Sequence, residues 1–207
     1  MSFLEELKRK KNILKPCETF YTDASGEKYL VKKNELGNEE ITKLKETTSG
    51  FVVDTKPDLQ IAEITSYLYL SSQDPVQDVS ILKKFGITYV LSVGIKISNK
   101  LSNITYKDIE LLDLPESTLM DVLDECFEFI HNAKLKNGKV LVHCNAGYSR
   151  SPSIVIGYLI NEYGYSFEKA LSLVKEKRDV KPNEGFIKQL KIYEESVFSK
   201  KKNYNEM

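Results

Sequence analysis

From residue 58 onward, short runs of hydrophobic residues alternate with longer segments in which hydrophobic residues recur every three or four positions. The short runs either alternate apolar with polar residues or are unbroken and rich in β-branched residues, and both patterns are typical of strands. We therefore predict strands at residues 59–64, 67–70, 88–93, 105–111 and 140–143. The last of these is apolar at three consecutive positions, which indicates a buried strand.

The longer segments have the periodicity of helices with one buried face. The first is predicted to open at Asp74-Pro75 and to end at Gly86, and the second spans residues 119–136. Three later helices are predicted to start at capping residues, namely Ser151, Ser166 and Asn183. Strands and helices in this order predict an α/β fold, with a central and mostly parallel sheet flanked by helices.

Residues 1–57 lack this alternation, and we interpret them as an N-terminal extension of a domain that spans residues 58–198. The polar stretch at residues 34–50 is interpreted as a linker between the extension and the domain. Residues 199–207 are interpreted as a charged tail.

Within the extension, two local structures are expected. A short amphipathic helix is predicted before Pro16, because proline does not continue a helix. Two β-prone runs at residues 19–21 and 28–31 flank the turn-forming sequence Asp23-Ala24-Ser25-Gly26. Together they predict a hairpin.

The composition argues against several classes of function. The chain has 30 Lys and Arg residues against 30 Asp and Glu residues, so no charge excess favours a nucleic-acid or anionic-lipid partner. The longest apolar run, residues 154–160, is far shorter than a membrane span, and the acidic N-terminus lacks the apolar core of a signal peptide. Three cysteines without paired spacing indicate a reducing compartment. We therefore expect a cytoplasmic protein, with the nucleus as a second location, and no membrane association.

The candidate chemistry lies between the strand at 140–143 and the helix predicted to begin with Ser151 as its cap and Pro152 as its first residue. This loop has Cys144 at its start and Arg150 at its end, and the whole chain has only three residues of each type. A loop that wraps back onto a helix N-terminus directs backbone N–H groups into one concavity, and such nests bind phosphate. The residues expected to supply these groups are Asn145, Ala146, Gly147, Tyr148 and Ser149.

Cys144 and Arg150 have the chemistry for phosphoryl transfer. Backbone dipoles and a nearby guanidinium stabilise a cysteine thiolate, which is the nucleophilic form. Arg150 can hold two phosphate oxygens through its planar guanidinium, and Gly147 suits positive φ or the close approach of a ligand. A thiolate on the floor of such a loop implies attack on phosphorus and a covalent phosphocysteine. The alternative is a buried free cysteine beside an incidental arginine.

The sequence HCNAGYSRSPS at residues 143–153 resembles the signature of the dual-specificity branch of the cysteine-dependent protein tyrosine phosphatase superfamily. The similarity spans residues 58–197 and is greatest to the small atypical phosphatases associated with stress-activated kinase pathways. It implies a protein tyrosine phosphatase-like fold and phosphorylated protein substrates, with kinases of those pathways among the partners. It also implies that Cys144 is the nucleophile, that Arg150 holds the phosphoryl group and that Ser151 stabilises the departing thiolate, with neither metal nor cofactor.

A phosphocysteine mechanism needs a general acid to protonate the leaving oxygen, and the family takes an aspartate from a mobile loop about thirty residues before the cysteine. Asp113 matches this position, between a predicted strand and a predicted helix. Asp108 is a weaker candidate because the alternation places it inside a strand, and Glu116 would serve only if the loop were rotated. The alternative for Asp113 is a residue that merely starts the turn before Pro115.

Features missing from the chain bear on its substrate. The chain contains no tryptophan, so it lacks the aromatic hinge of the acid loop in tyrosine-specific relatives, and we find none of their pocket-deepening insertions. A shallow cleft would accept phosphoserine and phosphothreonine as well as phosphotyrosine. The residues between Cys144 and Arg150 include no Lys or Arg, which favours proteins over inositol phospholipids or RNA 5′ ends. The rival interpretation is a phosphoprotein-binding scaffold that uses the pocket without turnover.

Four further residues have open or structural interpretations. Arg178 could contact a second substrate phosphate, as in relatives, but a basic side chain that favours the dipole at a helix end is the simpler interpretation. His143 is expected to support the loop through hydrogen bonds and not to act as a base. Cys126 lies on an apolar helical face and is expected in the core, whereas His131 is expected at the surface.

Overall fold

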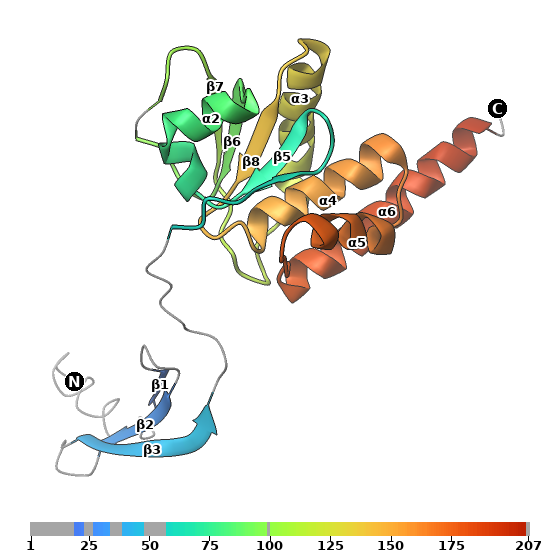
Figure 1. The fold of residues 1–207 in the computed structure, drawn as a ribbon. Helices are drawn as coiled ribbons and strands as arrows, with labels where there is room; N and C mark the ends of the chain where they lie inside the picture. The colour runs from blue at the N-terminus through green and yellow to red at the C-terminus, as the bar shows by residue number, and fades with distance from the viewer. Residues whose placement is uncertain (1–18, 23–26, 34–38, 48–56, 99, 206–207) are drawn as a thin grey trace, which may run out of the picture. The chain divides into compact units, whose positions relative to one another are not determined.

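The computed structural model describes residues 19–22, 27–33, 39–47, 57–98 and 100–205. It divides the chain into two compact units, Met1–Lys56 and Pro57–Met207 (Figure 1). The helix expected before Pro16 and the turn expected at residues 23–26 lie outside the described residues.

The first unit contains a three-stranded antiparallel sheet in the order β1-β2-β3 (Figure 1). Its strands are β1 (Thr19–Thr22), β2 (Glu27–Lys33) and β3 (Glu39–Thr47). The pairing of β1 with β2 confirms the strands of the predicted hairpin. β3 shows that the expected linker at residues 34–50 was wrong. Its polar residues pair across the sheet, for instance Glu40 opposite Lys32, and opposite charges at facing positions stabilise a strand pair.

The second unit is built on a five-stranded sheet in the order β4-β5-β8-β6-β7 (Figure 1). The strands are β4 (Ile61–Glu63), β5 (Leu68–Ser71), β6 (Tyr89–Val93), β7 (Thr105–Ile109) and β8 (Val140–His143). β5, β8, β6 and β7 run parallel, and β4 pairs antiparallel with β5. The predicted α/β fold is confirmed, and the strand that precedes Cys144 is the central strand of the sheet.

Helices cover both faces of this sheet (Figure 1). They are η1 (Asp74–Gln77), a 3-10 helix, and α2 (Val79–Phe85), α3 (Met120–Leu135), α4 (Arg150–Tyr163), α5 (Phe167–Lys177) and α6 (Glu184–Asn205). Alternate side chains of a strand point to opposite faces, so each strand contributes to two cores. On β8, Val140 and Val142 pack with residues of α3 to α6 in the larger core, and Leu141 packs with Leu82 of α2 in the smaller one.

One predicted helix is split in two. We expected a single helix from Asp74-Pro75 to Gly86, but η1 ends at Gln77 and α2 begins at Val79. The break occurs because the Asp78 carboxylate accepts hydrogen bonds from the N–H groups that follow it and so caps a new helix.

The predicted start of α4 was also wrong. Ser149, not Ser151, occupies the N-cap position, and the helix begins at Arg150. Pro152 therefore falls inside the first turn, where the N–H groups have no partner within the helix and a missing one is tolerated. The Ser151 hydroxyl serves the active site instead, as shown below.

The two later caps are confirmed. Ser166 accepts a hydrogen bond from the backbone N–H of Lys169, and the Asn183 side chain accepts one from the N–H of Phe186. α6 continues to Asn205, so the segment expected as a charged tail is largely helical.

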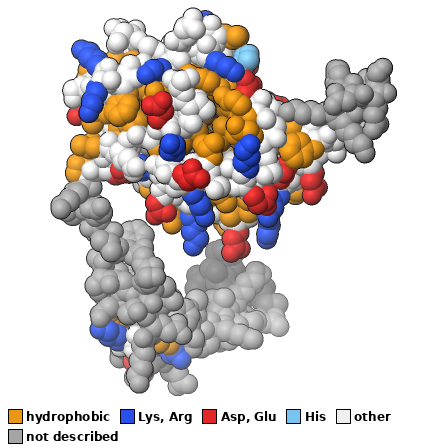
Figure 2. All heavy atoms as spheres, turned by 45° about the vertical axis from the view of Figure 1, so that its right-hand side comes forward, with side chains coloured by type: hydrophobic (Ala, Val, Ile, Leu, Met, Phe, Trp, Pro, Cys, Tyr) orange, Lys and Arg blue, Asp and Glu red, His pale blue; other side chains and the backbone are white. Residues whose placement is uncertain are grey.

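The face of the molecule shown in Figure 2 carries Lys and Arg side chains interspersed with Asp and Glu. This mixture agrees with the formal net charge of zero. In the part of the chain that the structure describes, no helix combines the length and the apolar character that crossing a membrane requires.

Candidate active site

Cys144 lies at the carboxyl end of the central strand, on the floor of the loop that leads into α4. Its side chain is buried, with 2% of the residue exposed. Two hydrogen-bond donors point at its sulfur: the backbone N–H of Gly147 at 3.2 Å and the Ser151 hydroxyl at 3.1 Å. Both donors favour a negative charge on Sγ, so this environment stabilises the thiolate. Residues 144–149, which connect β8 to α4, form a loop that we call the phosphate loop.

The carbonyl groups of the phosphate loop point away from Cys144. Hydrogen bonds of 2.8 to 3.1 Å reach four consecutive carbonyls from outside, those of Asn145, Ala146, Gly147 and Tyr148. In a trans peptide the carbonyl and the next N–H point in opposite directions, and the described backbone has no cis peptide bond. The following N–H groups therefore face the inside of the loop. The sequence prediction of an anion-binding nest thus agrees with the backbone geometry.

Arg178 holds two of these carbonyls in place. Its Nε donates to the Gly147 carbonyl at 3.1 Å and its Nη2 to the Ala146 carbonyl at 3.0 Å, while Nη1 donates to the carbonyl of Gln60. The same guanidinium pairs with the Asp58 carboxylate. Only 6% of Arg178 is exposed, so the structure does not place it for contact with a second substrate phosphate. Its contacts with three carbonyl groups also go beyond the expected interaction with the dipole at a helix end. It supports the phosphate loop from behind.

Gly147 has the positive φ that the sequence analysis anticipated, at 65°. A Cβ atom at this position would lie 2.5 Å from the carbonyl oxygen of Ser71. Side chains are therefore excluded both by the backbone conformation and by the neighbouring strand.

Arg150 offers the site a donor that makes no hydrogen bond. Its Nη1 donates to the carbonyl of Gly94 at 3.1 Å, and its Nε is buried without a hydrogen-bond partner. An unsatisfied buried donor is costly, and it is costlier still on a charged group. A phosphate oxygen would satisfy it.

Gly94 was missed by the sequence analysis. Its φ is 70°, and a Cβ atom there would lie 2.1 Å from Nη1 of Arg150. A larger residue would displace the Arg150 guanidinium. The available signal was a glycine that directly follows a β-prone run.

Asp113 is the acidic residue that the structure brings to Arg150. Its Oδ2 lies 3.6 Å from Arg150 Nε. Its Oδ1 accepts hydrogen bonds from the Ser149 hydroxyl at 2.7 Å and from the Asn183 amide at 2.9 Å. Oδ1 is therefore held by two donors, and Oδ2 faces the Arg150 guanidinium in an ion pair.

The two other acids considered lie differently. Asp108 is in β7, as its alternation indicated, and pairs with Lys100 at 2.6 Å. Glu116 is exposed, three residues beyond Asp113.

The segment that carries Asp113, residues 112–118, is called the acid loop below and rests on the start of α6. Gly185 packs so closely that a Cβ atom would lie 1.8 Å from the carbonyl oxygen of Pro115. The Gln189 side chain donates to the Ser117 carbonyl at 2.8 Å and accepts from the N–H of Leu119 at 2.8 Å. Sequence reasoning assigned no function to these α6 residues, because their partners lie about seventy positions away.

His143 is a buried, neutral support of the loop. Burial lowers its pKa from 6.5 to about 4. Its Nδ1 lies 3.3 Å from the carbonyl of Cys144, which can only accept, so Nδ1 carries the proton. Nε2 then accepts from the Ser92 hydroxyl at 2.8 Å. This arrangement matches the expected supporting role.

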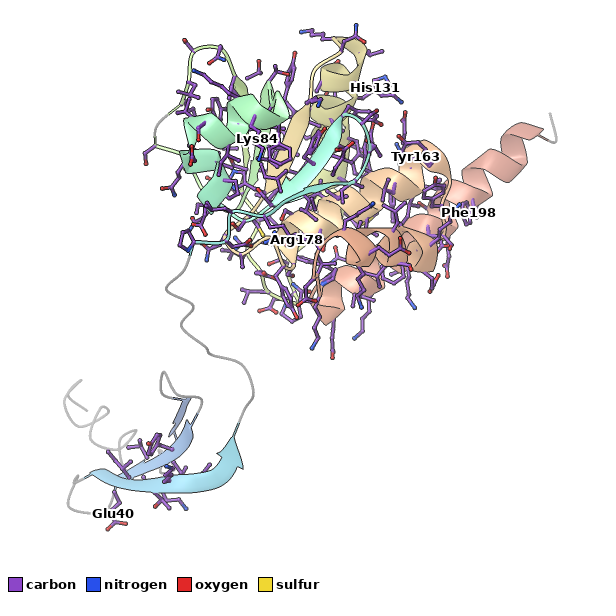
Figure 3. All side chains as sticks on the ribbon, viewed as in Figure 1. Glu40, Lys84, His131, Tyr163, Arg178 and Phe198 are labelled. Carbon is purple, nitrogen blue, oxygen red and sulfur yellow. The ribbon has the colours of Figure 1, made fainter. Side chains whose placement is uncertain are left out.

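The two remaining expectations are met. Cys126 is fully buried on α3, and burial raises the pKa of its thiol to about 12, so it is inert. The side chain of His131 is 49% exposed, on the surface of α3 (Figure 3). Within the described ranges, no three His, Cys, Asp or Glu side chains gather as metal ligands would.

Comparison with known proteins adds independent findings. Residues 68–196 match the family model described as the dual specificity phosphatase catalytic domain. The chain is 48% identical over 147 residues to dual specificity protein phosphatase 19 of Mus musculus, covering 70% of this chain and 67% of the relative. It is 36% identical over 225 residues to a probable dual specificity protein phosphatase of Dictyostelium discoideum, covering 94% and 98%. Its fold matches the crystal structure of DUSP15 with a TM-score of 0.62 at 32% identity, over 65% of this chain and 86% of that one.

Proposed function

Because this chain belongs to the dual-specificity phosphatase family and is a phosphatase, we propose that it hydrolyses phosphotyrosine and phosphoserine or phosphothreonine in proteins, with Cys144 as the nucleophile. The observation that carries this assignment is the sulfur of Cys144, which accepts two hydrogen bonds inside a loop of inward-facing N–H groups. The buried Nε of Arg150, which makes no hydrogen bond, borders the same space. A phosphoryl group in this position would meet positive charge on several sides.

In the first step, the thiolate of Cys144 attacks the phosphorus atom and the bond from phosphorus to the substrate oxygen breaks. Arg150 and the loop N–H groups hold the three equatorial oxygens. Asp113 gives a proton to the leaving oxygen, so the protein side chain departs as a neutral hydroxyl. A phosphocysteine remains.

In the second step, water attacks the phosphocysteine. Asp113, now a carboxylate, accepts a proton from that water, and the bond between sulfur and phosphorus breaks. The water oxygen and the three phosphoryl oxygens leave together as inorganic phosphate, and the sulfur of Cys144 is released as a thiolate. The Ser151 hydroxyl, 3.1 Å from Sγ, stabilises that leaving group. Positive charge throughout comes from Arg150 and backbone dipoles.

Protein substrates are favoured because the phosphate loop carries no basic side chain between Cys144 and Arg150. The names of these relatives also describe protein phosphatases. The resemblance to the small atypical branch extends the proposal to phosphoproteins of stress-activated kinase pathways, in the cytoplasm and secondarily the nucleus. A phosphoinositide or RNA phosphatase and a binding scaffold are the competing functions.

The test is hydrolysis of para-nitrophenyl phosphate in the presence of EDTA. Wild type should turn over, Cys144→Ser should be inactive, and Cys126→Ala should stay within about threefold of wild type because that thiol is inert in the core. Asp113→Asn should lose about a hundredfold on a phosphoserine peptide, whose leaving group needs the proton, and less on the nitrophenyl ester.

Two results would overturn the proposal. Wild type that binds vanadate without turnover would identify a scaffold. Faster hydrolysis of a phosphoinositide or a 5′-triphosphorylated RNA than of any phosphopeptide would move the substrate to another class.

A further inference from the structure

A pocket of about 500 Å³ lies directly beside the active site. It is lined by residues 94–96, which follow β6, and by residues 108–112, which lead from β7 into the acid loop. Each of these two walls ends at a catalytic group. Gly94 accepts the hydrogen bond from Arg150, and Leu112 immediately precedes Asp113. A ligand in the active site would therefore be continuous with this pocket, which is called the flanking pocket below.

The flanking pocket is mainly apolar. Ile109 and Leu111 contribute buried side chains and Ile95 a half-buried one, and Leu112 is 69% exposed. Binding sites often combine an exposed leucine with other apolar side chains in one surface pocket.

The charges that line the pocket are paired with each other or with neighbours. Lys96 and Glu110 form an ion pair at 3.3 Å, and Asp108 pairs with Lys100 at 2.6 Å. The lining itself carries one cation, Lys96, and two anions, Asp108 and Glu110, so it offers no unpaired positive charge for an anionic ligand. An apolar side chain is the ligand that this chemistry fits.

The pocket also opens at the edge of the sheet. β7 is the last strand in the order β4-β5-β8-β6-β7, so no described strand lies beyond it. An extended peptide can approach from that side. Successive residues of such a peptide advance by about 3.3 Å, so a side chain one or two positions from the phosphorylated residue reaches only about 3 to 7 Å from the catalytic centre. The pocket is linked to Arg150 through Gly94 and to Asp113 through Leu112, so such a side chain lies on its side of the catalytic centre.

We propose that the flanking pocket binds an apolar side chain, such as leucine or phenylalanine, next to the phosphorylated residue of a protein substrate. This specificity rests on the proposed function as a protein phosphatase. Its consequence is a preference among phosphopeptides that the phosphate-binding residues alone cannot give.

The experiment compares kcat/KM for phosphopeptides that differ only in the residues at positions one and two on either side of the phosphoresidue, set to leucine, serine or aspartate. Wild type should prefer a leucine peptide over its serine counterpart by about tenfold, the discrimination that one apolar contact provides. Leu112→Asp should abolish this preference. Leu135→Asp is the matched control, because Leu135 on α3 is equally exposed, at 67%.

A second variant separates the pocket from the acid loop. Ile95→Ala lies on the other wall and should also reduce the leucine preference, by about threefold to tenfold. If Leu112→Asp slowed all peptides equally, it would have disturbed Asp113 instead of the pocket, and an unchanged preference in Ile95→Ala would then overturn the proposal.

The outcomes also distinguish this proposal from the function on which it depends. Turnover of all phosphopeptides at equal rates would refute the flanking pocket and leave the phosphatase intact. No turnover of any phosphopeptide or aryl phosphate would refute the proposed function itself.

Discussion

Two loops meet at this active site and are held in different ways. Every carbonyl of the phosphate loop from Asn145 to Tyr148 has a hydrogen-bond partner. Arg178, which supplies two of these hydrogen bonds, is buried, with only 6% exposed. The acid loop, by contrast, is exposed over five consecutive residues, 112–116, and is attached through Asp113 and the start of α6. The difference matches the chemistry. The nucleophile and the phosphoryl group need donors in fixed positions. The acid, by contrast, must move as substrate binds and product leaves.

If the phosphate loop is as rigid as this comparison indicates, Gly147→Ala should have the largest effect. The added Cβ would meet the Ser71 carbonyl at 2.5 Å, and φ is already 65°. We expect loss of at least about a hundredfold in kcat/KM, since a displacement of about 1 Å in a catalytic frame costs that much. Gly86→Ala is the matched control. Its φ is 69°, but its Cβ would make only an ordinary contact at 3.7 Å, so activity should stay near wild type.

Arg178→Gln tests the support behind the same loop. The Ala146 and Gly147 carbonyls would lose their donors, and we expect the free energy of unfolding to fall by about 2 to 4 kcal/mol. Activity should fall with it, by about tenfold to a hundredfold. Asp58→Asn removes the ion pair but leaves the guanidinium on the carbonyls, so it should cost less in a denaturant titration. Equal losses in both variants would mean that the ion pair, not the carbonyl contacts, supports the loop.

His143 predicts a pH dependence of stability. In the folded protein its pKa is about 4 against 6.5 in the unfolded chain, so between these values the unfolded state binds more protons. Its contribution is complete above pH 6.5 and is lost as the pH falls toward 4, by about 3 kcal/mol at 1.36 kcal/mol per pH unit. Denaturant titrations of His143→Gln should show a flatter profile over that window.

The comparison of the two loops also explains what the sequence could predict. Cys144, Arg150 and Gly147 lie within seven residues on one strand–loop–helix unit, so local pattern and spacing were enough to find them. Asp113 was identified from the family resemblance, which implies an acid about thirty residues before the cysteine, and from its place between a predicted strand and a predicted helix. The supports were not found, because Arg178 reaches Gln60 across 118 residues and Asn183 reaches Asp113 across 70. Tertiary contacts of this kind leave no local pattern.

Competing local hydrogen bonds account for the boundary errors. Ser151 has the residue type of a helix cap, but its hydroxyl is bound to Cys144 and the cap moves to Ser149. Asp78 ended a predicted helix by capping another. In the first unit, β3 was missed because its polar residues conceal a strand whose charges pair across the sheet.

The smallest effect is expected for a change at Asn183, whose side chain connects the start of α6 to the acid loop. The Asn183 side chain both donates to Asp113 Oδ1 and caps α6 through the N–H of Phe186. Asn183→Ser keeps a good capping residue but loses the amide donor, so the free energy of unfolding should change by less than about 1 kcal/mol. With Asp113 less well held, we expect kcat for a phosphoserine peptide to fall by about tenfold, a part of what a general acid supplies. Hydrolysis of para-nitrophenyl phosphate, whose leaving group needs little protonation, should hardly change.

Asn161→Ser on α4 is the control. It removes an exposed hydrogen bond from Tyr193 and should leave both rates as in wild type. Equal losses on the two substrates would instead mean that the Asn183 side chain supports the phosphate loop as well as Asp113, and would remove the distinction drawn between the two loops.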